Sequence, residues 1–236
     1  MREELRRDRL YVAVDLMILT VRDGRLHLFL SRRGEKPFAG YPALPGRFVG
    51  LDETAETAVA RLISEVLPVP EPFLEQLYTF ADIDRDPRGR VVSIAYLAIV
   101  PWQKVRALQA SGQTALRPFR VTPTEEGGLY LTGEDGETLS GSDLAFDHGR
   151  IVTTGIRRLR GKIDYTEIGF HFLTDRTAFS LGELQTVFEA VLGMPLDSSN
   201  FRRFILNRYE KSGRLRQTEQ AEKKGRGRPA ALYRFD

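Results

Sequence analysis

Two carboxylates, one just before and one within a predicted helix, have the chemistry of weak metal ligands. Glu53 precedes a helix that the apolar periodicity predicts from Thr54 to Leu67, and Glu65 lies near the end of that helix. Hard cations such as Mg²⁺ need several oxygen ligands in a strict geometry, and the neighbouring Leu62 and Val66 supply none. We therefore expect at most a weakly bound metal ion here, and we favour plain carboxylates on a helix surface.

The same helix also fits a purely structural role. Leu62 and Val66 share one helical face with Ala58, Val59 and Ile63. An ordinary amphipathic helix, with its apolar stripe turned to the core, therefore remains an alternative interpretation.

The segment leading into this helix carries a family resemblance. Residues 45–53 read Pro-Gly-Arg-Phe-Val-Gly-Leu-Asp-Glu, and with the helix they resemble the signature box of the Nudix hydrolases. The residues in register with that box are Glu53, Arg61, Ile63, Glu65 and Val69. The replacements are Arg47 for Gly, Leu62 for Glu, Val66 for Glu and Pro68 for Gly. In Nudix hydrolases the carboxylates of this helix hold divalent metal ions that polarise a diphosphate and activate water. The resemblance implies a Nudix fold whose hydrolytic site is lost, so we expect no catalytic residues, no metal ion and at most weak hydrolysis.

Composition limits the class of protein. A length of 236 residues allows one large or two modest domains. The absence of Cys excludes a disulfide scaffold and a thiolate zinc site. No apolar run is long enough to cross a bilayer, and the first nine residues lack the apolar core of a secretion signal. We expect a cytoplasmic protein without a membrane partner.

Charge is unevenly distributed along the chain. Residues 196–236 hold 11 Lys and Arg against 5 Asp and Glu, a net charge of +6. The remaining residues hold 24 Lys and Arg against 27 Asp and Glu, a net charge of −3. An acidic body with a basic end indicates a C-terminal module that binds a polyanion, and the alternative is a solvated charged tail.

The order of elements predicts an α+β protein with two domains. Strands are expected at 11–21, 26–30, 75–81 and 91–100, with short strands within 117–139, and helices at 54–67, 103–110 and 151–161. This order suits an N-terminal Nudix-like α/β/α sandwich with a mixed sheet. We place the domain boundary near Asp164, which gives a sensing domain at 1–163 and a second domain at 164–236.

The second domain has sharp helix signals. Ser180 and Glu183 form a capping box, and Gly193 with Pro195 ends the helix that follows. Its expected buried face comprises Leu181, Leu184, Val187, Phe188, Val191 and Leu192. Asp197 can cap a second helix at 198–211, whose expected core residues are Phe201, Phe204 and Ile205.

A basic hairpin completes a winged helix-turn-helix. Strands at 215–217 and 232–235 flank the basic loop 223–229. In such a module the second helix enters the DNA major groove, where arginine can contact phosphate or guanine and asparagine can read adenine. The expected DNA contacts are Ser199, Asn200, Arg202, Arg203 and Asn207 on the helix and Lys223, Lys224, Arg226 and Arg228 in the wing. The alternatives are surface solvation for the helix, and a disordered tail or a protein-binding surface for the wing.

Together the two predicted domains resemble the Nudix-related transcriptional regulators. This family is typified by the NrtR proteins, which repress NAD biosynthesis genes. The supporting segments are 40–46, 77–80, 84–93, Asn200-Phe201-Arg202-Arg203 and Gly227-Arg228-Pro229. The resemblance implies a homodimeric repressor that binds a palindromic double-stranded DNA operator and responds to ADP-ribose or a related nucleotide, with no required cofactor. Sister groups respond to sugars or sugar phosphates. The enzyme alternative is a hydrolase of a nucleoside-diphosphate-linked substrate such as ADP-ribose.

The expected effector residues lie between the second strand and the box. Arg32, Arg33, Lys36 and Arg47 have the charge to neutralise a diphosphate, and Phe38 and Tyr41 can stack on a base. Loop solvation and packing are the alternative roles for these residues. Arg47 either adds a phosphate contact or fills the pocket. The three histidines, His27, His148 and His171, are too scattered for a local metal site and are expected to be structural or exposed rather than catalytic.

Overall fold

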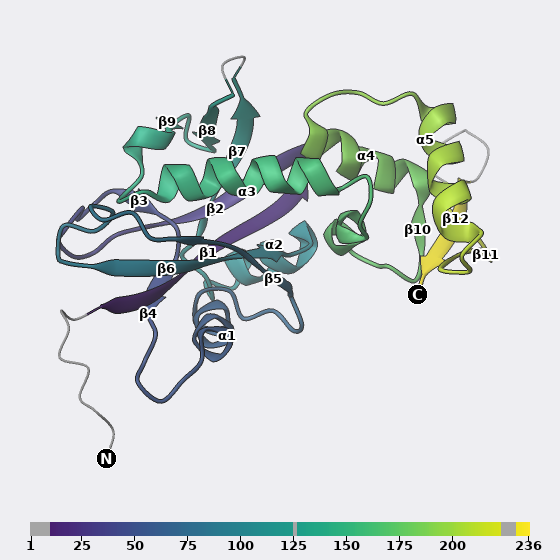
Figure 1. Ribbon diagram of the computed structural model, residues 1–236. Helices are drawn as coiled ribbons and strands as arrows, with labels where there is room; N and C mark the ends of the chain where they lie inside the picture. The colour runs from purple at the N-terminus through teal and green to yellow at the C-terminus, as the bar shows by residue number, and fades with distance from the viewer. Residues whose placement is uncertain (1–9, 125–126, 223–229) are drawn as a thin grey trace.

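The structure is a computed structural model that describes residues 10–124, 127–222 and 230–236. A large N-terminal domain is built on a twisted sheet, and a smaller C-terminal domain of helices and short strands sits at one end of it (Figure 1). The strands of the large domain are β1 (Tyr11–Arg22), β2 (Arg25–Arg32), β3 (Pro42–Ala43), β4 (Gly46–Phe48), β5 (Phe73–Phe80), β6 (Val91–Ile99), β7 (Arg117–Pro123), β8 (Leu129–Gly133) and β9 (Thr138–Ser140). Its helices are α1 (Ala55–Val66), α2 (Trp102–Ala110), the short 3₁₀ helix η1 (Gly141–Asp143) and α3 (His148–Lys162).

The sheet is mixed, as predicted. Its order in the described part of the chain is β5-β6-β1-β2-β7-β8-β9, with β3 paired to β2 and β4 to β1. The central pair β1 and β6 is parallel, and the other pairs are antiparallel. Asp23 and Gly24 both have positive φ, which is what a tight β1–β2 hairpin turn requires.

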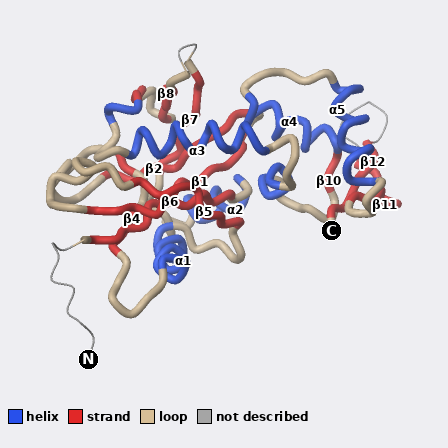
Figure 2. Tube along the Cα trace, in the orientation of Figure 1, coloured by secondary structure: helices blue, strands red, loops and turns tan. Residues whose placement is uncertain are grey.

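Helices cover both faces of the sheet (Figure 2). On one face, Leu62 of α1 packs with Ile18 and Phe29, so this position of the box belongs to the core. On the other face, α3 lies so close that a Cβ added to Gly155 would collide with Met17 Sδ. Burial on both sides explains why β1 is a nearly continuous apolar run. This arrangement is the predicted α/β/α sandwich.

The C-terminal domain is a winged helix. Its elements are η2 (Ile168–Phe172), β10 (Phe179–Ser180), α4 (Leu181–Leu192), α5 (Ser198–Ile205), the π-helical turn η3 (Leu206–Glu210), β11 (Leu215–Glu222) and β12 (Ala230–Phe235). The sheet order β10-β12-β11 gives the predicted hairpin after two helices. The capping box is confirmed, because Ser180 Oγ accepts from Glu183 N at 3.2 Å and Glu183 accepts from Ser180 N at 2.8 Å. Gly193 ends α4 with a φ of 77°.

Three details of this domain differ from the prediction. Phe204 was expected in the core but is 36% exposed, because Phe201 and Ile205 fill the space against α4 and leave Phe204 at the edge, beside Phe188. Leu192 is only half-buried, since it lies at the end of α4 next to the turn. The second helix is α-helical to Ile205 and continues as η3 rather than as a regular helix.

The two domains share one apolar core. A single cluster of buried side chains includes Leu28 of the sheet, Leu159 of α3 and Leu184 of α4. The domains are therefore packed together rather than linked by a free hinge. Among the described residues, no helix has the length and apolar character needed to cross a membrane.

Candidate functional site

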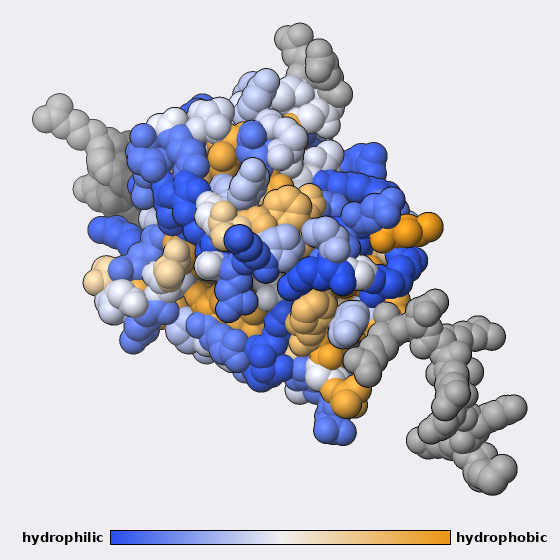
Figure 3. Space-filling model, turned by 90° about the vertical axis from the view of Figure 1, so that its left-hand side faces the viewer, coloured by the Kyte–Doolittle hydropathy of each residue, from blue (hydrophilic) through white to orange (hydrophobic). Residues whose placement is uncertain are grey.

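A cleft of about 290 Å³ opens beside β1 and β4 of the large domain. Its charged lining consists of Asp15, Arg33, Glu35, Arg47, Arg85, Asp86, Arg88 and His148, and its aromatic lining of Phe48 and Phe146. Figure 3 shows the side of the molecule that lies at the left in Figure 1. Hydrophilic side chains dominate this surface, and apolar side chains lie between them. A concave site lined by several cations and aromatic rings suits a ligand that combines phosphate with a ring system.

A buried ion cluster forms the floor of the cleft. Arg85, 8% exposed, donates from Nε and Nη2 to the two carboxylate oxygens of Asp147 at 3.0 and 2.7 Å. Its Nη2 also reaches Asp15 Oδ2 at 3.2 Å, and Ser93 Oγ donates to the same oxygen at 2.5 Å. Glycine is required at Gly46, because a Cβ there would collide with Asp15 Oδ1. Arg85 thus joins the carboxylates of Asp15 and Asp147 in the floor of the cleft.

Asp15 stays ionised in this cluster. Burial alone would raise the pKa of Asp15, but the charge and hydrogen bond of His148, the hydroxyl of Ser93 and the charge of Arg85 together lower it to about 2. His148 Nδ1 lies 2.9 Å from Leu44 N, and its Nε2 lies 3.5 Å from Asp15 Oδ1. His148 is buried at the wall of the cleft.

Aromatic rings and guanidinium groups form the rim. The Arg33 guanidinium lies 4.6 Å from the centre of the Phe146 ring, and that of Arg88 lies 5.5 Å from it. Phe38 packs edge-on against Phe146 at 4.8 Å. Phe38 and Phe146 have φ values of 64° and 55°, which are costly for aromatic residues and are typical of functional sites.

The residues of the box do not fit a metal ion. Glu53 Oε1 accepts from Gly50 N at 2.8 Å and from Arg61 Nη2 at 2.6 Å. Both carboxylate oxygens of Glu65 accept from Arg47 Nη1 at 2.8 Å. No group of three or more His, Cys, Asp or Glu side chains in the described residues is arranged to hold a metal. Arginines therefore engage Glu53 and Glu65, the two carboxylates that remain at signature positions of the box.

The predicted effector residues separate into two sets. Arg33 and Arg47 line the cleft, and Phe38 supports its rim. Arg32 faces away from the cleft, because it donates to both oxygens of Glu137 at 2.6 and 2.7 Å and to Gly40 O at 3.0 Å. Lys36 and Tyr41 are exposed and do not line the cleft.

Sequence reasoning missed most of the floor and rim. The residues it did not assign to the site are Asp15, Glu35, Phe48, Arg85, Asp86, Arg88, Phe146 and His148. One signal was available, since Asp15 is a lone carboxylate inside an apolar strand. Arg85, Asp86 and Arg88 come from one loop, Glu35 and Phe146 from two others, and Phe48 and His148 from β4 and α3, so their meeting depends on the tertiary fold.

Helix α5 and the turn η3 that follows it carry the predicted helix contacts to DNA, with Asn207 in η3. Ser199, Asn200, Arg202, Arg203 and Asn207 are all exposed. Arg203 Nη2 donates to Asn200 Oδ1 at 2.8 Å, and Arg202 Nη2 donates to Tyr233 Oη of β12 at 3.0 Å. The predicted wing contacts Lys223, Lys224, Arg226 and Arg228 lie outside the described residues. The described part presents two arginines and an amide on one exposed helix, as a major-groove reader requires.

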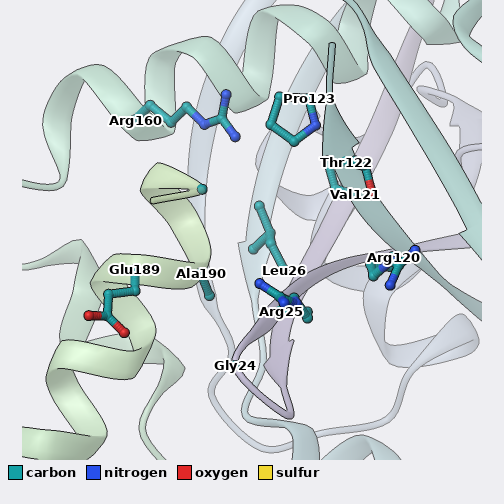
Figure 4. A pocket seen from close by; sticks show the side chains of 11 residues that line it. Gly24, Arg25, Leu26, Arg120, Val121, Thr122, Pro123, Arg160, Glu189 and Ala190 are labelled. Carbon is teal, nitrogen blue, oxygen red and sulfur yellow. The ribbon is translucent and has the colours of Figure 1, made fainter. Parts of the chain in front are cut away.

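A crevice of about 280 Å³ marks the junction of the domains (Figure 4). Arg160 from α3 lies on one side of it, and Arg25 and Arg120 from the sheet lie on the other. Arg160 Nε donates to Val191 O, near the end of α4, at 2.8 Å. Burial lowers the pKa of Arg160 from its usual value. This half-buried contact joins α3 of the large domain to α4.

Comparison with known proteins identifies the family. Residues 169–235 match the family model described as the NrtR DNA-binding winged helix domain. Over 226 residues, 95% of this chain, the sequence is 33% identical to the ADPR responsive transcriptional repressor NtrR of Acinetobacter baylyi and covers 81% of that protein. The chain belongs to the NrtR family.

Solved structures extend the NrtR likeness to the whole architecture. Shewanella oneidensis NrtR, in a crystal structure with a 27mer DNA, aligns with a TM-score of 0.74 and 30% identity, covering 95% of this chain and 93% of that chain. The NrtR-type chain is also similar to an enzyme. The ADP-ribose pyrophosphatase of Methanocaldococcus jannaschii is 37% identical over 164 residues, which are 68% of this chain and 83% of the enzyme.

Proposed function

We propose that this NrtR-family protein is a DNA-binding repressor whose operator affinity is set by ADP-ribose or a related nucleotide in the arginine-lined cleft. The A. baylyi relative is named as an ADPR-responsive repressor, and the S. oneidensis relative was crystallised with DNA. The cleft has cations for a diphosphate and rings for a base. The exposed face of α5 has the side chains for a DNA groove.

The observation that carries this proposal is that α3 contacts the cleft at one end and α4 near the other. Asp147, the N-cap of this 15-residue helix, accepts from Arg85 in the floor of the cleft. Arg160, in its last turn, donates to Val191 of α4. One rigid helix therefore contacts the effector cleft at its start and the DNA-binding domain near its end. An effector that shifts the floor would move α4, and a coupling free energy of about 1 to 3 kcal/mol would change DNA affinity by roughly 5- to 150-fold.

We assign the parts as follows. Arg33, Arg47 and Arg88 face the diphosphate, while Phe48 and Phe146 face the base. Ser199, Asn200, Arg202, Arg203 and Asn207 contact DNA, and the sensing and DNA-binding domains divide near Asp164. We further propose a homodimer on a palindromic operator, because a two-fold protein matches a two-fold site, and a cytoplasmic location where that operator is accessible.

Two measurements test the sensing role: whether the protein binds ADP-ribose, and whether the bound ADP-ribose remains unhydrolysed. Purified protein is titrated with ADP-ribose by calorimetry, and the same mixture with Mg²⁺ is then analysed by chromatography. We expect saturable binding with the nucleotide intact. An absence of binding, with tight binding of a pentose phosphate instead, would favour an effector of the sister groups.

The second candidate is an ADP-ribose hydrolase, which the identity with the M. jannaschii pyrophosphatase favours. We propose that this activity is absent, because Arg47 and Arg61 engage the two carboxylates left in the box. Mg²⁺-dependent release of AMP and ribose phosphate, abolished in Glu65→Gln, would establish the enzyme instead.

A further inference from the structure

Each carboxylate that remains in the box is paired with an arginine. Glu65 receives two 2.8 Å hydrogen bonds from Arg47 Nη1, and Arg61 Nη1 lies 3.9 Å from it. Glu53 receives Arg61 Nη2 at 2.6 Å. A divalent cation at this position would have to displace both guanidinium groups. The positive charge beside these two carboxylates therefore comes from arginine side chains of the protein and not from a metal ion.

Arg47 retains capacity to bind an anion. A guanidinium has five N–H donors, and the pairing with Glu65 uses one nitrogen. Its Nε is buried without a hydrogen-bond partner among the described residues. The side chain is 23% exposed and lines the cleft. Because the side chain reaches the surface of the cleft, the N–H groups that Glu65 does not use can donate to an oxygen ligand there.

The other cations of the cleft differ in how far they are neutralised. Arg85 is balanced by Asp15 and Asp147, and Arg88 by Asp86, whose Oδ2 lies 2.7 Å from Arg88 Nη2. Arg33 makes its hydrogen bond to the Pro37 carbonyl and has no carboxylate partner in the described part of the chain. Arg33 thus carries a charge that no carboxylate in the described residues balances, and Arg47, although paired with Glu65, lies in the lining of the cleft with N–H groups to spare.

We propose that Arg47 takes the place of the divalent cation, so that this protein binds the diphosphate of its effector without a metal ion. This inference rests on the proposed function for the identity of the effector. It assigns to Arg47 the neutralising role that a bound metal would otherwise have. A guanidinium polarises a phosphate without supplying an activated water, which suits a site that binds and does not hydrolyse.

The test compares ADP-ribose affinity of the full chain in EDTA and in Mg²⁺ by calorimetry. We expect the two dissociation constants to agree within about twofold. Arg47→Gln keeps a polar side chain of similar length and should weaken binding in EDTA by about tenfold or more, as loss of a charged hydrogen bond predicts. Arg32→Gln is the matched control, because Arg32 pairs with Glu137 outside the cleft, and its affinity should equal that of the wild type. Circular dichroism confirms that both variants are folded.

Failure of the inference is distinct from failure of the proposed effector. Wild-type affinity at least about fivefold higher in Mg²⁺ than in EDTA, a change of about 1 kcal/mol, overturns the inference and leaves ADP-ribose as the effector. Unchanged affinity of Arg47→Gln in EDTA overturns it as well. If ADP-ribose does not bind in either buffer, the proposed effector is wrong, and a Mn²⁺ titration followed by electron paramagnetic resonance then decides. Mn²⁺ bound by the wild type and lost in Glu65→Gln overturns the inference, whereas Mn²⁺ bound by Arg47→Gly and not by the wild type supports it.

Discussion

Asp147 and Arg160 lie near opposite ends of α3, about 20 Å apart at 1.5 Å per helical residue, and each makes the contact that ties this helix to a different site. Asp147 holds Arg85 in the floor of the cleft, and Arg160 holds the Val191 carbonyl of α4. The apolar face of α3 is packed on the sheet along its length, so the helix moves as a unit.

Arg160→Ala should uncouple the two sites. The substitution removes the hydrogen bond to Val191 and leaves the cleft intact, so the affinity for ADP-ribose should change by less than about twofold. The effect of ADP-ribose on DNA affinity, at least about fivefold in the wild type, should shrink to less than about twofold. Fluorescence anisotropy with a duplex that the protein selects from a randomised pool measures both. Arg120→Ala, on the sheet side of the same crevice, is the control and should respond as the wild type does. A full response in Arg160→Ala would show that coupling takes another route.

Asp15→Asn should destabilise the large domain. The variant removes the buried charge between Arg85, Ser93 and His148, and breaking one partner of a buried ion cluster costs about 3 kcal/mol of unfolding free energy. Urea unfolding at pH 7 measures the change. Glu35→Gln removes an exposed carboxylate from the same cleft and should stay within about 0.5 kcal/mol of the wild type. If Asp15→Asn lowers the unfolding free energy by less than about 0.5 kcal/mol, the ion cluster does not stabilise the floor.

Acid should weaken the junction of the domains through His171. This residue of η2 packs against Phe73 of β5 with ring centres 4.2 Å apart. Burial and the charge of Arg176 lower the pKa of His171 to about 4. The neutral ring is therefore favoured in the folded protein, so the stability it contributes is complete above pH 6.5, its ordinary value, and falls as pH drops toward 4.

Thermal unfolding of His171→Phe tests this directly. The variant cannot be protonated, so its melting temperature should fall less between pH 7 and pH 5 than that of the wild type. Parallel decreases in the two proteins would show that His171 is protonated without cost.

Removing the two helix arginines should weaken DNA binding and its dependence on salt. Arg202→Ala with Arg203→Ala deletes two exposed cations from α5. If both contact phosphate, the slope of log affinity against log salt should decrease by about 2. Anisotropy titrations at several salt concentrations give the slope. Arg106→Ala, an exposed arginine on α2, should leave it unchanged. Unaltered affinity in the double variant would exclude α5 as the reading helix, and weak salt dependence of the wild type would favour a protein partner for the wing.

Features with short-range causes were predictable from the sequence. The capping box of Ser180 and Glu183 and the turn at Asp23 and Gly24 depend on residues one to three positions apart. Their chemistry is local, so the pattern was sufficient. Phe204 was misplaced because the edge of a helical stripe depends on what packs opposite it.

The floor of the cleft could not be predicted in the same way. Arg85 meets Asp147 across 62 sequence positions and Asp15 across 70. Such contacts are set by the tertiary fold and have no period in the sequence. Arg33 lines the cleft and Arg32 faces away from it, because consecutive residues of an extended chain point to opposite sides. Composition marked both as phosphate ligands, and only Arg33 lines the cleft.

The most direct test of an effector-controlled repressor is the affinity for its selected DNA duplex with and without saturating ADP-ribose. We predict a change of at least about fivefold, and linkage requires that DNA change the affinity for ADP-ribose by the same factor. Equal DNA affinities in the presence and absence of bound ADP-ribose would contradict the account.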